Sequence, residues 1–257
     1  MRRFVHLDWI GPIALLTLNR AERHNSLVPG LLEDLIAALE EVKAEPDVRA
    51  MVLMAKGRSF STGGDIREFY KNIDTIKEYA DIVVGKLNQV ILALIDLPVP
   101  IVAAVHGIIT GGSLGFVLAS DIVLMAPEAS IIPYYNVLGF SPDGGWTALL
   151  PNIIGPKRTA EILMLNQTIT AEQAVAWGLA NRVISSERIH EEALNTAQQI
   201  ADQSPGTIHY TKRLVSVDKT EIAVRLEAER SNFVKQITTE EAQRGMQAFL
   251  ENPQKNT

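Results

Sequence analysis

Three glycine-containing segments carry the groups that could do chemistry in this sequence. The first is Ser59-Phe-Ser-Thr-Gly-Gly-Asp-Ile66, placed where a buried strand is expected to give way to a helix. Gly63 and Gly64 let a ligand approach the backbone closely, and free N–H groups at a helix start can bind an anion or an oxyanion. The structural alternative is a common glycine turn with Asp65 as the helix cap.

The second segment, Thr110-Gly-Gly-Ser-Leu-Gly115, again leads from a strand through a loop to a helix. A glycine pair at a helix start directs peptide N–H groups outward. The alternative is close packing of helix against strand, with Gly115 removing side-chain bulk. The spacing matches neither the dinucleotide-binding fingerprint nor a phosphate-binding P-loop.

The third segment, Leu138-Gly-Phe-Ser-Pro-Asp-Gly-Gly-Trp146, places an acid between a proline and two glycines. Such an acid is usually a turn residue or a helix cap. The functional interpretation is a carboxylate, Asp143, on a rigid turn beside the aromatic residues Tyr134, Tyr135, Phe140 and Trp146. Burial there would raise the pKa of Asp143 toward the range useful for a general base.

Composition narrows the functional classes. The 257 residues include 24 basic and 30 acidic side chains, a net charge of −6, and 47% are hydrophobic, which favours a folded core and argues against nucleic acid as a partner. Cysteine is absent, so neither disulfides nor thiolate chemistry is expected. The five histidines show no metal-binding spacing, and no GxSxG motif indicates a nucleophilic serine. No metal site is therefore predicted.

One stretch calls for a membrane test. Residues 97–120 carry no formal charge and are long enough to cross a bilayer. Prolines and glycines interrupt them and no basic flank follows, so a buried strand, a glycine turn and a buried helix are the better interpretation. Asp8 interrupts any apolar run after the basic N-terminus, which argues against a signal peptide. We therefore expect a cytoplasmic protein without membrane contact.

Hydrophobic periodicity predicts an α/β chain. Strands are expected at 4–9, 13–18, 48–55, 101–105 and 122–125, and helices at 31–42, 75–95 and 114–119. This order favours parallel pairing through right-handed crossovers. After about residue 150 the pattern is helical, with no strand expected beyond 182–184. We predict a core over residues 1–200 and a helical C-terminal region over residues 201–257.

Several motifs occur together in an order that resembles the enoyl-CoA hydratase/isomerase (crotonase) family. They are Asn19-Arg-Ala-Glu-Arg-His-Asn-Ser-Leu27, Phe60-Ser-Thr-Gly-Gly-Asp-Ile66 and Ala104-Val-His-Gly107 through Gly111–Gly115 to Ser120-Asp121, followed by Leu138-Gly139, Gly155-Pro156 and Ala171–Gly178. The resemblance covers essentially the whole chain. It implies the crotonase (ClpP-like) fold, an α/β spiral of ββα units with a helical C-terminal trimerisation region, and self-association as a trimer or a dimer of trimers.

The resemblance also implies an acyl-CoA substrate and no separate cofactor, since the coenzyme A thioester is itself the substrate carrier. The N–H groups of Gly64 and Gly112 would bind the thioester oxygen and stabilise the enolate that forms when a C2 proton leaves. Loss of one such donor typically costs about 3 kcal/mol of barrier. The implied substrate-binding residues, which include the segment similar to the CoA nucleotide site, are Arg23, Asn25, Leu27, Thr62, Asp65, Ile66, Gly111, Tyr135, Phe140 and Trp146.

Two departures from the family pattern bear on the reaction. Hydratases of the family carry two glutamates, and the corresponding positions here are Gly115 and Tyr135, so water addition by two carboxylates is not favoured. Asp143 stands where isomerases of the family have a single catalytic Glu or Asp. One carboxylate can remove a proton at C2 and return it at C4, which favours an enoyl-CoA isomerase with Asp143 as acid and base.

Alternatives remain open at this point. Hydrolytic aroyl-CoA dehalogenases of the family place a nucleophilic Asp at the position of Asp143, although their accompanying histidine has no counterpart between residues 69 and 89. A hydratase-like lyase and a non-catalytic acyl-CoA binder are further hypotheses.

Overall fold

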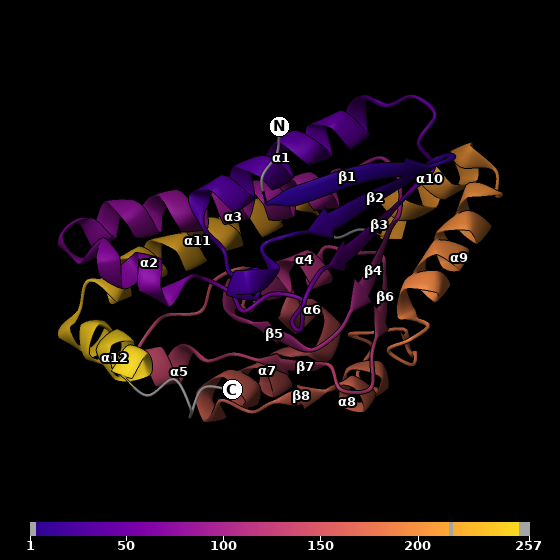
Figure 1. Ribbon diagram of the computed structural model, residues 1–257. Helices are drawn as coiled ribbons and strands as arrows, with labels where there is room; N and C mark the ends of the chain where they lie inside the picture. Colours follow the sequence, from indigo (N-terminus) through magenta and orange to yellow (C-terminus); the bar gives the residue numbers. More distant parts are fainter. Residues whose placement is uncertain (1–3, 216–217, 252–257) are drawn as a thin grey trace.

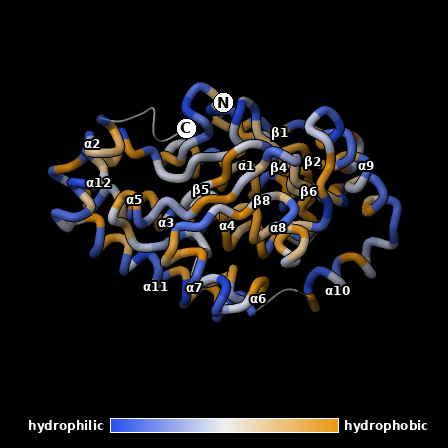
Figure 2. Tube along the Cα trace, turned by 90° about the horizontal axis from the view of Figure 1, so that it is seen from below, coloured by the Kyte–Doolittle hydropathy of each residue, from blue (hydrophilic) through white to orange (hydrophobic). Residues whose placement is uncertain are grey.

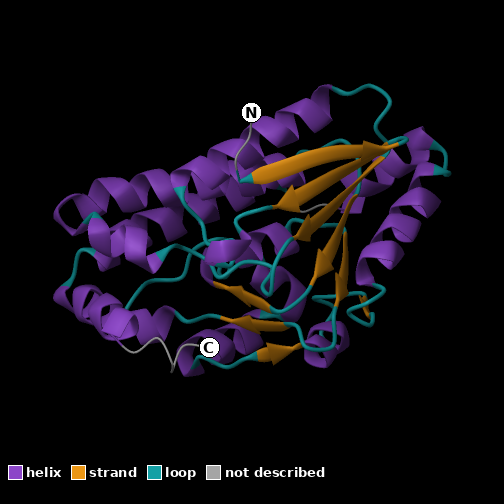
Figure 3. Cartoon of the chain, viewed as in Figure 1, coloured by secondary structure: helices purple, strands orange, loops and turns teal. Residues whose placement is uncertain are grey.

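The protein contains two sheets in the part described by the computed structural model, residues 4–215 and 218–251. The larger sheet has strand order β1-β2-β3-β4-β6-β9 and the smaller has order β5-β7-β8. The strands are β1 (Val5–Ile10), β2 (Ile13–Leu18), β3 (Ala50–Ala55), β4 (Ile101–Val105), β5 (Ile108–Thr110), β6 (Ile122–Met125), β7 (Ser130–Ile132), β8 (Ile169–Thr170) and β9 (Arg182–Val183). Figure 3 shows the small sheet below the large one.

Helices surround these sheets. They are α1 (Pro29–Ala44), α2 (Ile66–Lys71), α3 (Ile76–Ile95), α4 (Leu114–Leu118), α5 (Tyr135–Leu138), α6 (Leu150–Ile154), α7 (Pro156–Leu165), α8 (Ala171–Ala176), α9 (Ile189–Ala201), α10 (Pro205–Val215), α11 (Lys219–Ile237) and α12 (Glu240–Glu251). Helices α1, α3 and α11 pack side by side, and α9 packs against β3 and β4 (Figure 1). The large sheet therefore has helices on both sides.

The hydrophobic pattern explains the centre of the fold. Every residue of β3 and of β4 is buried, as expected for parallel strands covered on both faces. β1 and β2 form the predicted antiparallel hairpin, in which Ile10 pairs with Ile13. Hydrophobic segments gather around the strands, while the outer helices carry much of the hydrophilic surface (Figure 2). The glycine loops follow the buried strands of this sheet along the chain.

Most of the predicted elements in the first 125 residues are confirmed, whereas the small sheet was not predicted. The strand predicted at 182–184 is present as β9, but the expectation that no other strand follows residue 150 is wrong, because β8 pairs with β7 over Ile169–Thr170. The missed strands are only two or three residues long, too short to show an alternating pattern. The uncharged stretch 97–120 does form β4, β5 and α4 with the glycine turn between them. Among the described residues, no helix combines the length and apolar character that a membrane crossing requires.

The C-terminal region is helical as predicted, with α10, α11 and α12 following residue 200. The boundary at residue 200 and the trimerisation of this region stay predictions. Helix α11 lies along α3, and α12 packs against α5 and α2. The last helices thus return to the part of the molecule that holds the glycine loops (Figure 1).

Candidate active site

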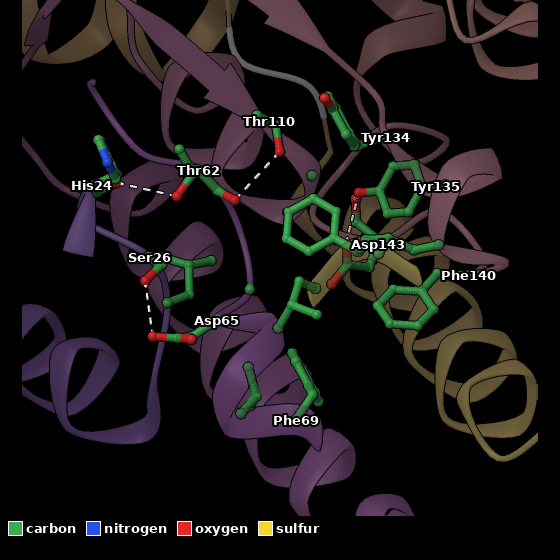
Figure 4. A pocket seen from close by; sticks show the side chains of 18 of the residues that line it. His24, Ser26, Thr62, Asp65, Phe69, Thr110, Tyr134, Tyr135, Phe140 and Asp143 are labelled. Carbon is green, nitrogen blue, oxygen red and sulfur yellow. Dashed lines mark hydrogen bonds between the residues drawn. The ribbon is translucent and has the colours of Figure 1, made fainter. Parts of the chain in front are cut away.

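A cavity of about 440 Å3 lies where the three glycine-containing segments meet. All but two of the residues predicted from the sequence line it, namely Arg23, Leu27, Thr62, Gly64, Asp65, Ile66, Gly111, Gly112, Tyr135, Phe140 and Asp143. Figure 4 shows Thr62 and Thr110 on one side of this space and Tyr135, Phe140 and Asp143 on another. Residues from distant parts of the chain therefore face one cavity.

Asn25 and Trp146 are not brought to the cavity wall. The Asn25 side chain is fully buried, where it accepts from the Arg20 N–H and donates to the carbonyls of Lys56 and Ser59. Trp146 is also fully buried, and its Nε1 donates to the Gly111 carbonyl at 2.8 Å. Their observed contacts therefore stabilise the two glycine loops from behind.

The first glycine loop presents the Gly64 peptide to the cavity. Leu27 and Gly64 form a parallel bridge, in which the Leu27 N–H donates to Gly63 and the Asp65 N–H donates to Leu27. Because backbone groups alternate in direction along such a bridge, the N–H of Gly64 points away from Leu27. A neighbouring bridge between Ser61 and Ile109 fixes this loop beside the second one.

The second glycine loop places Gly112 in a single 3-10 turn, Gly111–Ser113, before α4. The first N–H groups of such a turn have no acceptor within it, so the Gly112 peptide is available to a ligand in the cavity that it lines. The Ser113 hydroxyl donates to the Thr110 carbonyl at 2.7 Å and to the Ser61 carbonyl at 3.1 Å. These bonds hold the turn against the first loop.

Asp143 lies next to Gly112 in the cavity wall. A Cβ atom built on Gly112 would lie 3.0 Å from Asp143 Oδ1 and 3.1 Å from Oδ2. The Asp143 side chain is only 6% exposed, and it receives the Tyr135 hydroxyl on Oδ1 at 2.7 Å. The carboxylate therefore stands close to the second peptide donor, and Tyr135 fixes its orientation (Figure 4).

Burial changes the titration of both members of this pair. Desolvation raises the pKa of Asp143 to about 7, and the negative charge of Glu229 acts in the same direction, while the Tyr135 hydrogen bond opposes it. Desolvation and the nearby Asp143 charge raise the pKa of Tyr135 well above its ordinary value. At neutral pH Tyr135 is thus a hydrogen-bond donor, whereas the raised pKa of Asp143 lies near neutrality. This is the range in which a carboxyl group can both take and return a proton.

Asp65 serves the structure in addition to lining the cavity. Its carboxylate caps α2 through the N–H groups of Arg67 and Glu68 and pairs with Arg20 at 2.9 Å and Arg23 at 3.0 Å. Burial raises the pKa of Asp65, but these arginines outweigh it and hold the pKa below its ordinary value. The capping interpretation of the first motif is therefore confirmed.

Several residues of the cavity wall carry no signal in the sequence. Phe69 from α2 and Phe233 from α11 line the cavity, and both pack against the predicted Phe140 with ring centroids 6.3 Å and 5.3 Å away. Phe233 lies in a helix of charged residues far along the chain, so no local motif marks it. The part of the cavity beside Asp143 is consequently aromatic and apolar.

Metal chemistry has no candidate centre in the described ranges. Within 4–215 and 218–251, no three His, Cys, Asp or Glu side chains come together in a group that could hold a metal ion.

Comparisons with known proteins agree with this fold. Residues 10–256 match the enoyl-CoA hydratase/isomerase family. A 1,2-epoxyphenylacetyl-CoA isomerase of Escherichia coli is 29% identical over 93% of this chain and 92% of the relative, and a probable enoyl-CoA hydratase of Bacillus subtilis is 30% identical over 93% and 92%. The crystal structure of an enoyl-CoA hydratase from Bacillus halodurans shares the fold, with a TM-score of 0.89 at 24% identity over 96% of this chain and all of that one.

The architecture defines an α/β crotonase fold with a helical C-terminal region. The chain belongs to the enoyl-CoA hydratase/isomerase family, whose members act on acyl-CoA substrates. The resemblance that the motifs indicated is thereby confirmed. The matched relatives include both a named isomerase and a probable hydratase, so the choice of reaction depends on the site itself.

Proposed function

We propose that this protein is an enoyl-CoA isomerase that shifts a carbon–carbon double bond with Asp143 as its single acid and base. The N–H groups of Gly64 and Gly112 bind the thioester oxygen and stabilise the enolate. Asp143 removes a proton from C2 and returns it at C4, so the atoms balance without water or a second acid. No separate cofactor takes part, because coenzyme A is the carrier of the acyl group.

One observation carries the proposal: a buried carboxylate lies directly beside a peptide donor. A thioester whose carbonyl oxygen accepts the Gly112 N–H would have its α-carbon close to this glycine. The Asp143 oxygens are also close, because a Cβ atom built on Gly112 would lie 3.0 Å and 3.1 Å from them. The raised pKa of Asp143, about 7, supports proton transfer near neutral pH. Peptide donors in this arrangement supply the largest share of the stabilisation.

The surroundings of Gly115 argue against two-carboxylate hydration. A Cβ atom there would lie 2.7 Å from the Gly144 carbonyl oxygen and 2.8 Å from Ile91 Cγ1, so there is no room for a glutamate side chain. At the second glutamate position, Tyr135 donates to Asp143 and stays protonated because burial raises its pKa. Asp143 remains as the carboxylate that lines the cavity beside Gly112.

Conversion of a 3-enoyl-CoA to the conjugated 2-enoyl-CoA, followed by ultraviolet absorbance, tests the proposal. Asp143→Asn should lower kcat by about 10^2- to 10^4-fold, the usual contribution of a positioned acid–base group, with little change in KM. Asp47→Asn, an exposed aspartate in the turn before β3, is the matched control and should retain wild-type turnover. Unchanged turnover in Asp143→Asn, or a product with added water, would contradict the proposal.

A further inference from the structure

The segment that follows Asp143 is held by a carboxylate from a distant helix. Glu229 of α11 accepts four hydrogen bonds from this segment. Its Oε2 receives the Gly145 N–H at 2.8 Å, and its Oε1 receives the Thr147 N–H at 2.7 Å, the Thr147 hydroxyl at 2.7 Å and the Ala148 N–H at 2.9 Å. One side chain of α11 thus fixes the backbone immediately after the proposed base.

Glu229 is unusual among the charged residues of its helix. It is only 4% exposed, whereas Glu227 and Arg230 form an ion pair on the outer side of α11, where Arg230 also pairs with Asp81 of α3. All four donors to Glu229 belong to uncharged groups; burial raises the pKa of Glu229, and these hydrogen bonds lower it in part. A buried carboxyl group is costly unless it is hydrogen-bonded, and the four hydrogen bonds of Glu229 all go to the segment after Asp143.

We propose that Glu229 is a positioning residue for Asp143: it holds the segment 145–148, which directly follows the proposed base, on α11. The inference rests on the proposed role of Asp143 as the base. The C-terminal helical region thereby completes the site of its own chain.

The groups around Asp143 define what the charge of Glu229 does. Helix α3 contributes the apolar Leu87, the second loop contributes Gly112, α5 contributes Tyr135 and α11 contributes Glu229. Only Tyr135 and Glu229 of these four titrate. After burial itself, the Tyr135 hydrogen bond lowers the pKa of Asp143 and the Glu229 charge raises it. Burial raises the pKa of Glu229 too, while its four donors favour ionisation.

The charge-removing variant Glu229→Gln tests the positioning role. The amide has one acceptor oxygen, so at least one of the four hydrogen bonds is lost together with the charge. We expect kcat to fall about tenfold with little change in KM, and the acidic limb of the pH profile of kcat/KM to move down by about one pH unit, because a like charge disfavours ionisation. Glu227→Gln, the same change two residues away on an exposed side chain, should leave both quantities unchanged.

A second variant and a direct titration complete the test. Glu229→Asp keeps the charge but shortens the side chain, so the acidic limb should stay close to that of the wild type while kcat falls. The Asp143 carboxyl can be titrated in isotope-edited infrared spectra, with Asp143→Asn as the subtraction reference, in the absence of substrate. If the wild type isomerises no enoyl-CoA, the proposed function fails, and this titration still tests Glu229. Identical Asp143 titration in the wild type and in Glu229→Gln, with unchanged kcat, would overturn the inference.

Discussion

The proposed peptide donors and the proposed base face the same cavity but are held there in different ways. Gly64 and Gly112 stand on short loops next to buried strands, and bridges between neighbouring backbones fix them. Asp143 lies in an irregular segment that is hydrogen-bonded to the side chains of Tyr135 of α5 and Glu229 of α11. Pairing between backbones positions one half of the site, and side-chain contacts position the other.

This difference indicates where the reaction can vary within the fold. The proposed oxyanion-binding peptides lie on loops paired with other backbone segments, whereas the proposed base is contacted by side chains of α5 and α11. Loops on a rigid scaffold commonly carry such functional variation. The following predictions test whether the two halves respond differently to substitution.

The largest effect is expected from a methyl group at the second peptide donor. In Gly112→Ala the new Cβ would lie 2.5 Å from Leu87 Cδ2 and 3.0 Å from Asp143 Oδ1, so both the donor and the base must move. In Gly64→Ala the Cβ would meet the Phe69 ring at 2.7 Å and would disturb the donor alone. Loss of one donor lowers kcat about 10^2- to 10^3-fold, and Gly112→Ala should cost about tenfold more.

Steady-state kinetics of 3-enoyl-CoA isomerisation measures this pair of variants. Gly206→Ala, where an added methyl group would contact nothing within 4 Å, is the control for a Gly-to-Ala change. Equal losses for Gly64→Ala and Gly112→Ala would show that the base does not depend on the second loop.

Substitution of Asp65 tests the structural support of the first glycine loop separately from the proposed reaction. Asp65→Ala removes the cap of α2 and leaves Arg20 buried without its carboxylate partner, which should lower the free energy of unfolding by about 3–5 kcal/mol at pH 7. Because the folded-state pKa of Asp65 is lowered, its contribution is present above pH 3.8 and is lost as the pH falls through the folded value. Urea unfolding at pH 7 and pH 3 should show the gap shrinking in acid, while the exposed Asp74→Ala changes little.

The contribution of Asp143 to stability should depend on pH in the opposite way to that of Asp65, because burial of the ionised Asp143 carboxylate opposes folding. The pKa of Asp143 is about 7 in the folded protein and 3.8 for an unperturbed aspartate, so wild-type stability falls as the pH rises between these values. That interval corresponds to at most about 4 kcal/mol. Asp143→Asn should therefore be more stable than the wild type at pH 8, with a gain that disappears toward pH 4. A constant difference across this range in thermal unfolding would show that Asp143 does not titrate as described.

The smallest of these effects is expected for Tyr135→Phe. Its pH profile should shift in the direction opposite to that of Glu229→Gln. Tyr135→Phe removes the hydroxyl that stabilises the ionised Asp143, so the pKa of Asp143 and the acidic limb of the kcat/KM profile should rise by about one pH unit. Activity lost at neutral pH should return partly at higher pH. A downward shift, as expected for Glu229→Gln, would contradict the assignment of Tyr135 as a donor.

The same contrast explains what could be predicted from the sequence. Gly64 and Gly112 lie in contiguous motifs, and the buried strands beside them have clear hydrophobic patterns, so this half of the site was found along with its fold. Asp143 was found from its turn and from the family resemblance. Trp146 was predicted on the cavity wall because of its aromatic character, but its ring lies behind the Gly111 carbonyl.

Glu229 and Phe233 could not be found in this way. They lie on a helix whose sequence is mostly polar, and a buried glutamate there looks like its exposed neighbour Glu227. Only the packing of α11 against α3 and against the segment after Asp143 separates the two. The short strands of the second sheet were missed for the related reason that pairing with distant residues, rather than local pattern, creates them.

The transfer of an isotope label from C2 to C4 tests the single-base account most directly. A 3-enoyl-CoA deuterated at C2 would be converted in ordinary water, and the product analysed by NMR and mass spectrometry. Since Asp143 is buried and acts alone, the product should carry a substantial fraction of the removed deuterium at C4, and no oxygen from water. A product whose C4 hydrogen comes entirely from solvent, or one that contains a new hydroxyl group, would contradict the account.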